Sequence, residues 1–190
     1  MKTNKMIPRF VVIISALLLI SCMLPGMIPL PNGTPTPTPT MEKDANKVIA
    51  ALQGNNYVRL EALAQEKYTE QDFAKPGTLT FTVKVTDNKP TYFSYGWCAK
   101  DQNTLQQNYQ HINVSLYLND KKLGQDVVHP LSYATSDNLA CGDYGVLITD
   151  WPAGQYKLKA VASFADRIND GMSDYAAGDY VFVYNVTVAK

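Results

Sequence analysis

One stretch near the C-terminus concentrates the oxygen ligands that calcium prefers in proteins. Asp166, Asp170 and Asp174 lie close together in the chain, around an Asn-Asp-Gly sequence. Several carboxylates spaced around a glycine are typical of calcium loops. In an EF-hand frame, however, Ile168 and Ala177 stand where oxygen ligands belong, and Asn-Asp-Gly is a strong turn signal by itself. The spacing therefore favours a plain turn and leaves the three aspartates as a weak metal candidate.

The rest of the chain has no pattern typical of an enzyme. His111 and His129 are its two histidines, and neither has a second His or Cys at metal-ligand spacing. The sequence contains no Gly-x-Ser-x-Gly turn for a nucleophile and no glycine-rich phosphate loop. We therefore expect surface or strand-end histidines, no catalytic residue, no metal and no cofactor.

Aromatic side chains are the other candidates for a binding role. Tyr92, Tyr95 and Trp97 lie in one short stretch, and Trp151 follows later. Exposed aromatic rings stack on sugars or anchor protein partners, whereas buried ones contribute to a core. Both interpretations stay open for these four residues.

The N-terminus has the order of a secretory signal peptide. Three basic residues (Lys2, Lys5, Arg9) precede the apolar run 10–20, which is too short to span about 30 Å of hydrocarbon. The run ends in Leu-Ile-Ser-Cys, with the cysteine at position 22. We expect residues 1–21 to be a signal peptide.

That ending resembles the lipobox of bacterial lipoproteins. The resemblance implies that the Cys22 thiol is acylated and that cleavage occurs before it, so that the chain is attached to a membrane by its N-terminal lipid. The alternative is an uncleaved transmembrane anchor, although Pro25-Gly26 ends the apolar run early. Either alternative places the bulk of the chain outside the cytoplasm.

Residues 22–40 are predicted to be a linker. Proline alternates with threonine over 34–40, which excludes a helix and favours an extended chain of about 3.1 Å per residue. The linker is either a spacer of roughly 30 Å or a disordered tail. We therefore place the start of the folded part near residue 41, with short helices over 41–76 and β-structure over 77–190.

Charge excludes two classes of partner. Removal of residues 1–21 takes away three basic side chains and leaves 14 basic against 17 acidic, a net charge of −3. A nucleic-acid-binding protein needs a basic field, and anionic lipid headgroups need a basic cluster. We expect neither partner.

Two cysteines remain if Cys22 carries lipid. Cys98 and Cys141 would then form a disulfide in an oxidising, extracytoplasmic compartment. The alternative is a pair of buried thiols, in an organism that does not oxidise its exported proteins.

The folded part begins with helical spacing and then changes to a period of two. Apolar residues predict one helix from Met41 to Leu52, with Thr40 as its N-cap and Gly54 as its end, and a second over 57–68. A short turn capped by Thr69 follows. Alternating or apolar runs then predict about seven strands, at 78–86, 91–98, 112–118, 122–128, 144–149, 156–164 and 180–188, with a turn at Asn119-Asp120.

Seven strands suit an antiparallel two-sheet sandwich. Gly154-Gln155-Tyr156 and Gly178-Asp179-Tyr180 each place a glycine two residues before a tyrosine that opens a late strand. This entry resembles immunoglobulin-like and fibronectin-type domains, and the resemblance implies a tryptophan near an inter-sheet disulfide, for which Trp97, Cys98 and Cys141 are the candidates. The chain departs from that family because its tryptophan adjoins the first cysteine and no tyrosine stands two residues before the second. The prediction is a mainly β, immunoglobulin-like sandwich after a short helical hairpin, and it transfers no functional residue.

Anchor, spacer and sandwich together favour a non-catalytic, lipid-anchored module on the extracytoplasmic face of the membrane or envelope, which binds a protein or carbohydrate. Two alternatives remain: a structural envelope lipoprotein, and an accessory enzyme subunit whose carboxylates meet only in the fold. An exposed aromatic patch would favour binding, a concave pocket with two close carboxylates would favour the enzyme, and a featureless surface would favour the structural protein.

Replacement of Cys22 by Ser should release the protein from membranes, because the serine hydroxyl cannot take the lipid of a lipobox cysteine. Incorporation of radiolabelled palmitate, followed by membrane fractionation, measures the effect. Label that persists in the Cys22→Ser protein would contradict the lipobox interpretation.

Overall fold

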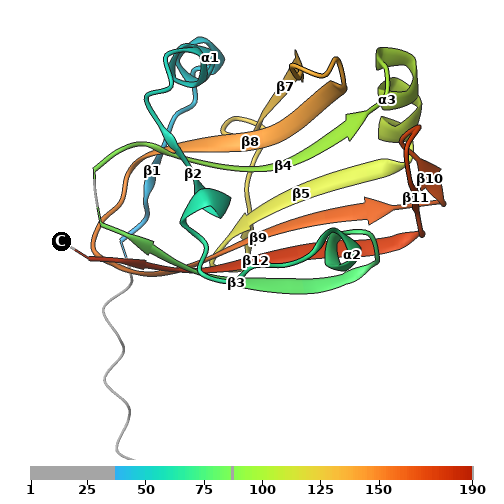
Figure 1. Cartoon of the computed structure of the whole chain (residues 1–190). Coiled ribbons are helices and arrows are strands. Elements are labelled where there is room, and N and C mark those ends of the chain that lie inside the picture. The colour runs from blue at the N-terminus through green and yellow to red at the C-terminus, as the bar shows by residue number, and fades with distance from the viewer. Residues whose placement is uncertain (1–36, 87, 190) are drawn as a thin grey trace, which may run out of the picture. The chain divides into compact units, whose positions relative to one another are not determined.

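The computed structural model describes residues 37–86 and 88–189. This part of the chain is mainly β, as the alternating pattern predicts, and its long strands form two layers that face each other (Figure 1). The predicted signal peptide, Cys22 and most of the predicted linker lie outside the described residues. Among the described residues, no helix is long and apolar enough to cross a bilayer.

The strands divide into two sheets and one small hairpin. The first sheet has the order β1-β8-β4-β2, with β7 also paired to β8, and consists of β1 (Thr40–Met41), β2 (Val58–Arg59), β4 (Thr91–Ala99), β7 (His129–Ala134) and β8 (Ala140–Asp150). The second has the order β3-β12-β9-β5-β6 and consists of β3 (Gly77–Val85), β5 (Ile112–Leu118), β6 (Lys121–Lys122), β9 (Gly154–Phe164) and β12 (Gly178–Val188). The hairpin is β10 (Ile168–Asn169) with β11 (Asp174–Tyr175), and the helical elements are α1 (Ala45–Gln53), the 3-10 turn η1 (Leu60–Leu63), α2 (Glu70–Phe73) and α3 (Gln102–Tyr109).

Six of the seven predicted strands form, because side chains that alternate between apolar and polar suit a sheet with one buried face. They are β3, β4, β5, β8, β9 and β12. The strand predicted at 122–128 is wrong: β6 ends at Lys122, and the next strand, β7, begins at His129. Asn119 and Asp120 form the predicted turn between β5 and β6, both with positive φ (47° and 63°).

The prediction of a purely antiparallel sandwich is wrong. Strand β3 runs parallel to β12, from Gly77↔Tyr180 to Val85↔Val188, and β2 runs parallel to β4. Alternation along a strand tells which side chains share a face, but it does not tell the direction of the neighbouring strand. Strand β3 is followed by a strand of the other sheet, so no hairpin sets its direction relative to β12.

The predicted helical hairpin is also wrong. The first helix forms as α1, ends at Gly54 as predicted, and is capped by Asp44 rather than Thr40, with the Asp44 carboxylate accepting from the amide of Asn46 at 2.9 Å. The second helix is replaced by β2, η1 and an extended segment whose Gln65 amide donates to the carbonyl of Thr82 at 3.0 Å. Hydrogen bonds to the two sheets thus replace those of a helix. Thr69 does form a capping box at the start of α2.

The two Gly-x-Tyr sequences open β9 and β12 as expected. Gly154 and Gly178 have φ of 155° and 134°, a conformation that favours glycine. The hydroxyl of Tyr156 donates to the carbonyl of Pro152 at 2.8 Å, and the hydroxyl of Tyr180 donates to that of Ala176 at 3.0 Å. Each ring is buried and fixes the entry of its strand into the core.

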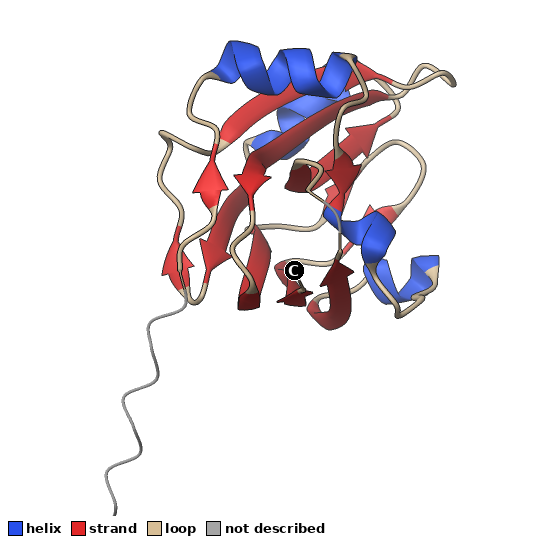
Figure 2. Cartoon of the chain, turned by 90° about the vertical axis from the view of Figure 1, so that its left-hand side faces the viewer, coloured by secondary structure: helices blue, strands red, loops and turns tan. Residues whose placement is uncertain are grey.

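Helix α1 covers part of the outer face of the first sheet, above β8 and β4 (Figure 1). Figure 2 shows helices outside the layers of strands. Val48 of α1 packs against Tyr92 of β4 and Leu147 of β8 in a small core, separate from the main core between the sheets. The outer face therefore has a covered part under α1 and a part beyond it.

Cys98 and Cys141 form the predicted disulfide, with 4.1 Å between their Cα atoms. They are directly opposite each other on β4 and β8, so the bond joins two strands of one sheet. The inter-sheet disulfide implied by the immunoglobulin resemblance is thus wrong. Trp97 faces the other way, into the core, where its ring contacts those of Phe164 and Tyr175.

Reduction of this disulfide should destabilise the domain by about 4 kcal/mol in the chain-entropy model, since it closes a loop between residues 43 positions apart. For a domain of this size the unfolding midpoint should fall by on the order of 10 °C. Calorimetry with and without reductant measures the shift, and a Cys98→Ser/Cys141→Ser variant should match the reduced protein. Two thiols that alkylate in the exported protein without reductant would contradict the bond.

Candidate functional site

The four aromatic residues considered for binding are all buried. Their exposed fractions are 0% for Tyr92, 9% for Tyr95, 8% for Trp97 and 7% for Trp151. Tyr95 and Trp97 face the main core, while Tyr92 faces outward and is covered by α1. These positions do not form an exposed patch.

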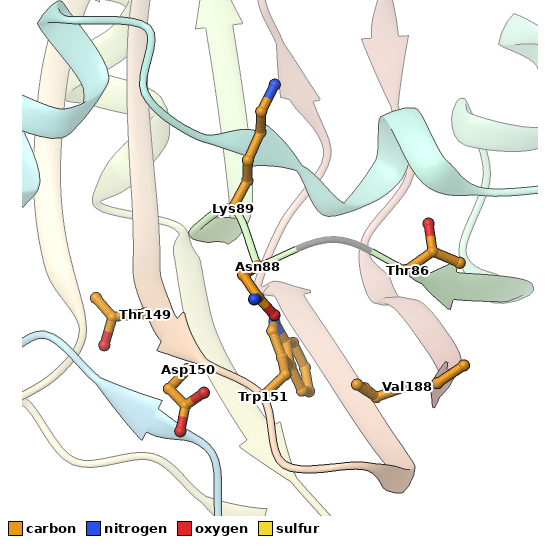
Figure 3. A pocket seen from close by; sticks show the side chains of 8 residues that line it. Thr86, Asn88, Lys89, Thr149, Asp150, Trp151 and Val188 are labelled. Atoms are coloured by element: carbon orange, nitrogen blue, oxygen red, sulfur yellow. The ribbon is translucent and has the colours of Figure 1, made fainter.

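Trp151 lies at one end of the sandwich, beside a hollow of about 610 Å³ (Figure 3). Its indole donates to the hydroxyl of Thr91 at 3.2 Å, and its ring meets that of Tyr156 edge-on. Polar residues, including Asn88 and Asp150, line much of the hollow. The tryptophan closes the end of the core.

The aspartates of the acidic loop point to separate partners. The Asp166 carboxylate lies 2.9 Å from Nδ1 of His111, and that of Asp174 accepts from Nη2 of Arg167 at 2.8 Å. Asp170 is buried, and its carboxylate accepts from the amides of Met172 and Ser173 at 2.7 Å. Residues 170–173 form the turn of the β10–β11 hairpin, closed by the hydrogen bond from the Asp170 amide to the Ser173 carbonyl, as the turn interpretation predicts. No group of three or more His, Cys, Asp or Glu side chains suited to a metal occurs in the described ranges.

His129 is buried rather than exposed, and its Nε2 lies 3.2 Å from the carbonyl oxygen of Glu42. It is the first residue of β7, which agrees with the prediction of a strand-end histidine. His111 is exposed beside Asp166.

The structure brings together a charged pair that the sequence analysis missed. Asp143 lies on the outer face of β8, beyond α1, and is only 2% exposed. Its Oδ2 lies 3.6 Å from Nη2 of Arg59 and accepts from the hydroxyl of Ser94 at 3.5 Å. Its Oδ1 is buried and has no hydrogen-bond partner among the described residues. A buried carboxylate with a free oxygen is costly, so this one is a candidate for a functional role.

Two glycines make room for the side chains of this outer face. Gly96 is directly opposite Asp143 across the β4–β8 pair, and a Cβ on it would collide with Oδ1 of Asp143. A Cβ on Gly145 would collide with the ring of Tyr92. We define the Arg59–Asp143 site as Arg59, Ser94, Gly96, Tyr133 and Asp143.

Burial and charge both affect the ionisable groups here. Burial raises the pKa of Asp143, and the Arg59 guanidinium opposes that rise without cancelling it. Burial lowers the pKa of Arg59, but the carboxylates of Asp143 and Glu61 outweigh it and raise the pKa overall. Glu61 reaches Nη1 of the same guanidinium at 3.2 Å. Arg59 is therefore held between two carboxylates.

Two grooves meet at the Arg59–Asp143 site. The β4 groove, of about 470 Å³, runs between β4 and the segment 59–73. The β7 groove, of about 480 Å³, runs between α1 and β7. Arg59, Tyr133 and Asp143 line both grooves.

Exposed large apolar side chains gather at these grooves. Ile49 (38% exposed) lines the β7 groove, Phe73 (41%) lines the β4 groove, and Tyr133 (42%) lines both. In the part of the chain that the structure describes, Met172 is the only other exposed large apolar side chain. The surface around Asp143 thus combines apolar rings with a buried charge.

One signal for the site exists in the sequence. Asp143 lies in Cys-Gly-Asp-Tyr-Gly, where a charge flanked by glycines interrupts an otherwise apolar strand. Nothing in the chain around Arg59 indicates its partner, because the two residues meet only through the pairing of β2, β4 and β8.

The chain matches no protein-family model and no curated protein. Three solved structures show a slight likeness. PbICP-C in complex with falcipain-2 is 10% identical, with 70% of this chain and 99% of that chain covered and a TM-score of 0.38. A cysteine protease inhibitor, EhICP2, from Entamoeba histolytica is 8% identical over 60% of this chain and 96% of that chain (TM-score 0.31), and the solution structure of Amebosin is 16% identical over 59% and 96% (TM-score 0.28). Likeness this slight supports no inference about this chain.

Raising the pH should destabilise the wild-type protein relative to an Asp143→Asn variant. Because the folded-state pKa of Asp143 is raised, its contribution to stability is complete below the unfolded pKa of 3.8 and is lost as the pH rises through the folded pKa. Thermal unfolding of both proteins from about pH 3 to about pH 7 measures the difference.

An Asp126→Asn variant is the control. The hydrogen bond from Lys43 lowers the pKa of the exposed Asp126 carboxylate, so its contribution should instead be lost as the pH falls. If the difference in stability between wild type and Asp143→Asn did not grow with pH, the prediction that burial raises the pKa of Asp143 would be wrong.

Proposed function

We propose that the chain is an extracytoplasmic lipoprotein, anchored through Cys22, whose β-domain binds a protein partner at the Arg59–Asp143 site. One observation carries the binding part: three of the four exposed large apolar side chains in the described residues line the two grooves that meet at Asp143. Apolar side chains gathered around a desolvated polar group are typical of interaction sites. A protein fits this surface better than a sugar, because the apolar contacts lie in two connected grooves.

The chemistry of the site suits recognition of a partner. Tyr and Arg are enriched among the residues that dominate binding energy, and Tyr133 and Arg59 line both grooves. The Arg59 guanidinium is held by Glu61 and Asp143, so little side-chain freedom would be lost when a partner binds.

We further propose that the domain is a variant of the immunoglobulin-like sandwich. Tyr156 and Tyr180 support this proposal, because each hydroxyl bonds a carbonyl four residues earlier. A tyrosine whose hydroxyl returns to the upstream backbone is a recurrent corner of that architecture.

A second candidate function is carboxylate chemistry, as in an accessory subunit of an enzyme. The favouring observation is that Glu61 and Asp143 line the same groove and that burial raises the pKa of Asp143. Activity against a substrate that is lost in both Glu61→Gln and Asp143→Asn would establish it, whereas a binding role predicts no such activity.

A photo-crosslinking amino acid tests the binding proposal in the cells that produce the protein. Placed at Tyr133 or Phe73, it should yield a discrete crosslinked protein band, because both side chains line the grooves. Placed at Lys121, in β6, it should yield none. The band from Tyr133 should fall at least several-fold in an Arg59→Ala background. Equal crosslinking from all three positions, or none from either groove position, would contradict the proposed site.

A further inference from the structure

Among the described residues, part of β4 has no neighbouring strand on one side. Strand β2 pairs with β4 only at Thr91 and Tyr92, and the hydrogen bond from the Lys100 amide to the Asp170 carbonyl (2.8 Å) lies beyond its other end. Between these points, from Ser94 to Cys98, β4 pairs with β8 alone. This stretch is an open sheet edge of roughly 17 Å.

The backbone groups of alternate residues point out of this edge. On the side away from β8, the Pro90 carbonyl accepts from the Val58 amide, and the Lys100 amide donates to the Asp170 carbonyl. Backbone groups alternate sides along a strand, and the β4–β8 register is unbroken, so Ser94, Gly96 and Cys98 point the same way. The short Cα separation of Cys98 and Cys141 supports this orientation. In an antiparallel pair, the opposite residues with the shorter Cα separation do not hydrogen-bond to each other, so the backbone groups of Cys98 point away from β8.

The edge lacks the usual protection against pairing. Natural edges carry charged residues, proline or bulges, whereas Ser94–Cys98 reads Ser-Tyr-Gly-Trp-Cys. Ser94, Gly96 and Cys98 line the β4 groove, and Gly96 is exposed. The edge thus lies inside a groove, where its backbone is accessible to an added strand.

A chain placed along this edge would have different surroundings on its two faces. Tyr95, Phe182 and Tyr184 line the inward side of the groove, where they would contact apolar side chains of the added chain. On the outward side lies Gly96, which has no side chain, and opposite it on β8 lies the carboxylate of Asp143, whose Oδ1 is buried. Side chains that alternate along the added chain would therefore meet an apolar surface and a carboxylate in turn.

The charges of the groove favour a basic residue at the outward position. Glu61, Glu66 and Asp143 line it, against Arg59 and Lys67. A lysine or arginine beside Gly96 would complement this acidic lining.

We propose that the β4 groove binds an extended segment of a partner protein as an added strand along Ser94–Cys98, with apolar side chains facing inward and a basic side chain beside Gly96 that complements the acidic lining of the groove. The proposal rests on the binding function proposed above and specifies the partner's chemistry. Strand addition draws affinity from backbone hydrogen bonds and specificity from alternate side chains, and this edge offers both. Self-pairing of two β4 edges would also satisfy the backbone, but it would bring no basic side chain to the acidic groove, because Ser94–Cys98 contains none.

Random peptides of about seven residues, displayed on phage and selected on the full-length protein in detergent, supply the probe. The selected peptides should alternate apolar residues and share one Lys or Arg. Hydrogen–deuterium exchange on the complex with the synthesised peptide should slow at the amides of Ser94, Gly96 and Cys98, and not at those of the β5–β6 turn.

A proline provides a matched pair of variants. Ser94→Pro removes an amide that points out of the edge and bonds nothing in β8, while Ser94→Ala removes only the hydroxyl. Peptide affinity should fall at least tenfold in Ser94→Pro and by less in Ser94→Ala, which keeps the amide and loses only the hydroxyl that donates to Asp143. Asp143→Asn should weaken the basic peptides at least tenfold and leave variants with a neutral residue at that position unchanged. Exchange in the wild-type complex decides the question if Ser94→Pro fails to fold.

Two results would overturn the strand-addition proposal. One is peptide binding that leaves exchange at Ser94, Gly96 and Cys98 unchanged. The other is concentration-dependent dimerisation that slows exchange there without any peptide. If crosslinking from Tyr133 persists in either case, the proposed binding function stands and only the mode of binding is wrong. Absence of that crosslinking would contradict both the binding function and the strand addition.

Discussion

Strands β4 and β8 are paired without interruption from Thr91↔Ile148 to Ala99↔Ala140, and most of the described structure depends on this pairing. It sends one set of side chains, including Phe93 and Trp97, into the core between the sheets. It directs the other set outward, where Cys98 meets Cys141. Because the disulfide joins a directly opposite pair, it holds the register that determines both faces; a slip of one residue would exchange them.

The outer face of this pair has two parts. Under α1 it is apolar, and Tyr92 and Leu147 complete a small second core. Beyond α1 it carries Asp143, whose burial is unfavourable and is only partly offset by Arg59. An apolar residue at this position would avoid that cost, so stability alone does not explain the carboxylate.

The groove exists because of the path of the chain between the sheets. After β2 the chain leaves the first sheet, passes through η1, and joins the edge of β3 at Ala64 and Gln65. In the described structure, the second half of β4 is therefore left with β8 as its one neighbour, while the crossing segment forms the far wall of the groove. A helix over 57–68 would have made its hydrogen bonds internally and would not have joined the two sheets along this path.

The sequence by itself determined the local structure. Strands such as β3, β9 and β12 follow from alternation, because a strand with one buried face has a side-chain period of two, and the turns at Gly154 and Gly178 follow from the freedom of glycine. Only the tertiary structure decided strand direction, the replacement of the second helix, and the burial of the aromatic residues, because these depend on which elements become neighbours. The same holds for the candidate site: residues 59 and 143 are distant in the chain, and their contact requires β2, β4 and β8 to lie side by side in one sheet.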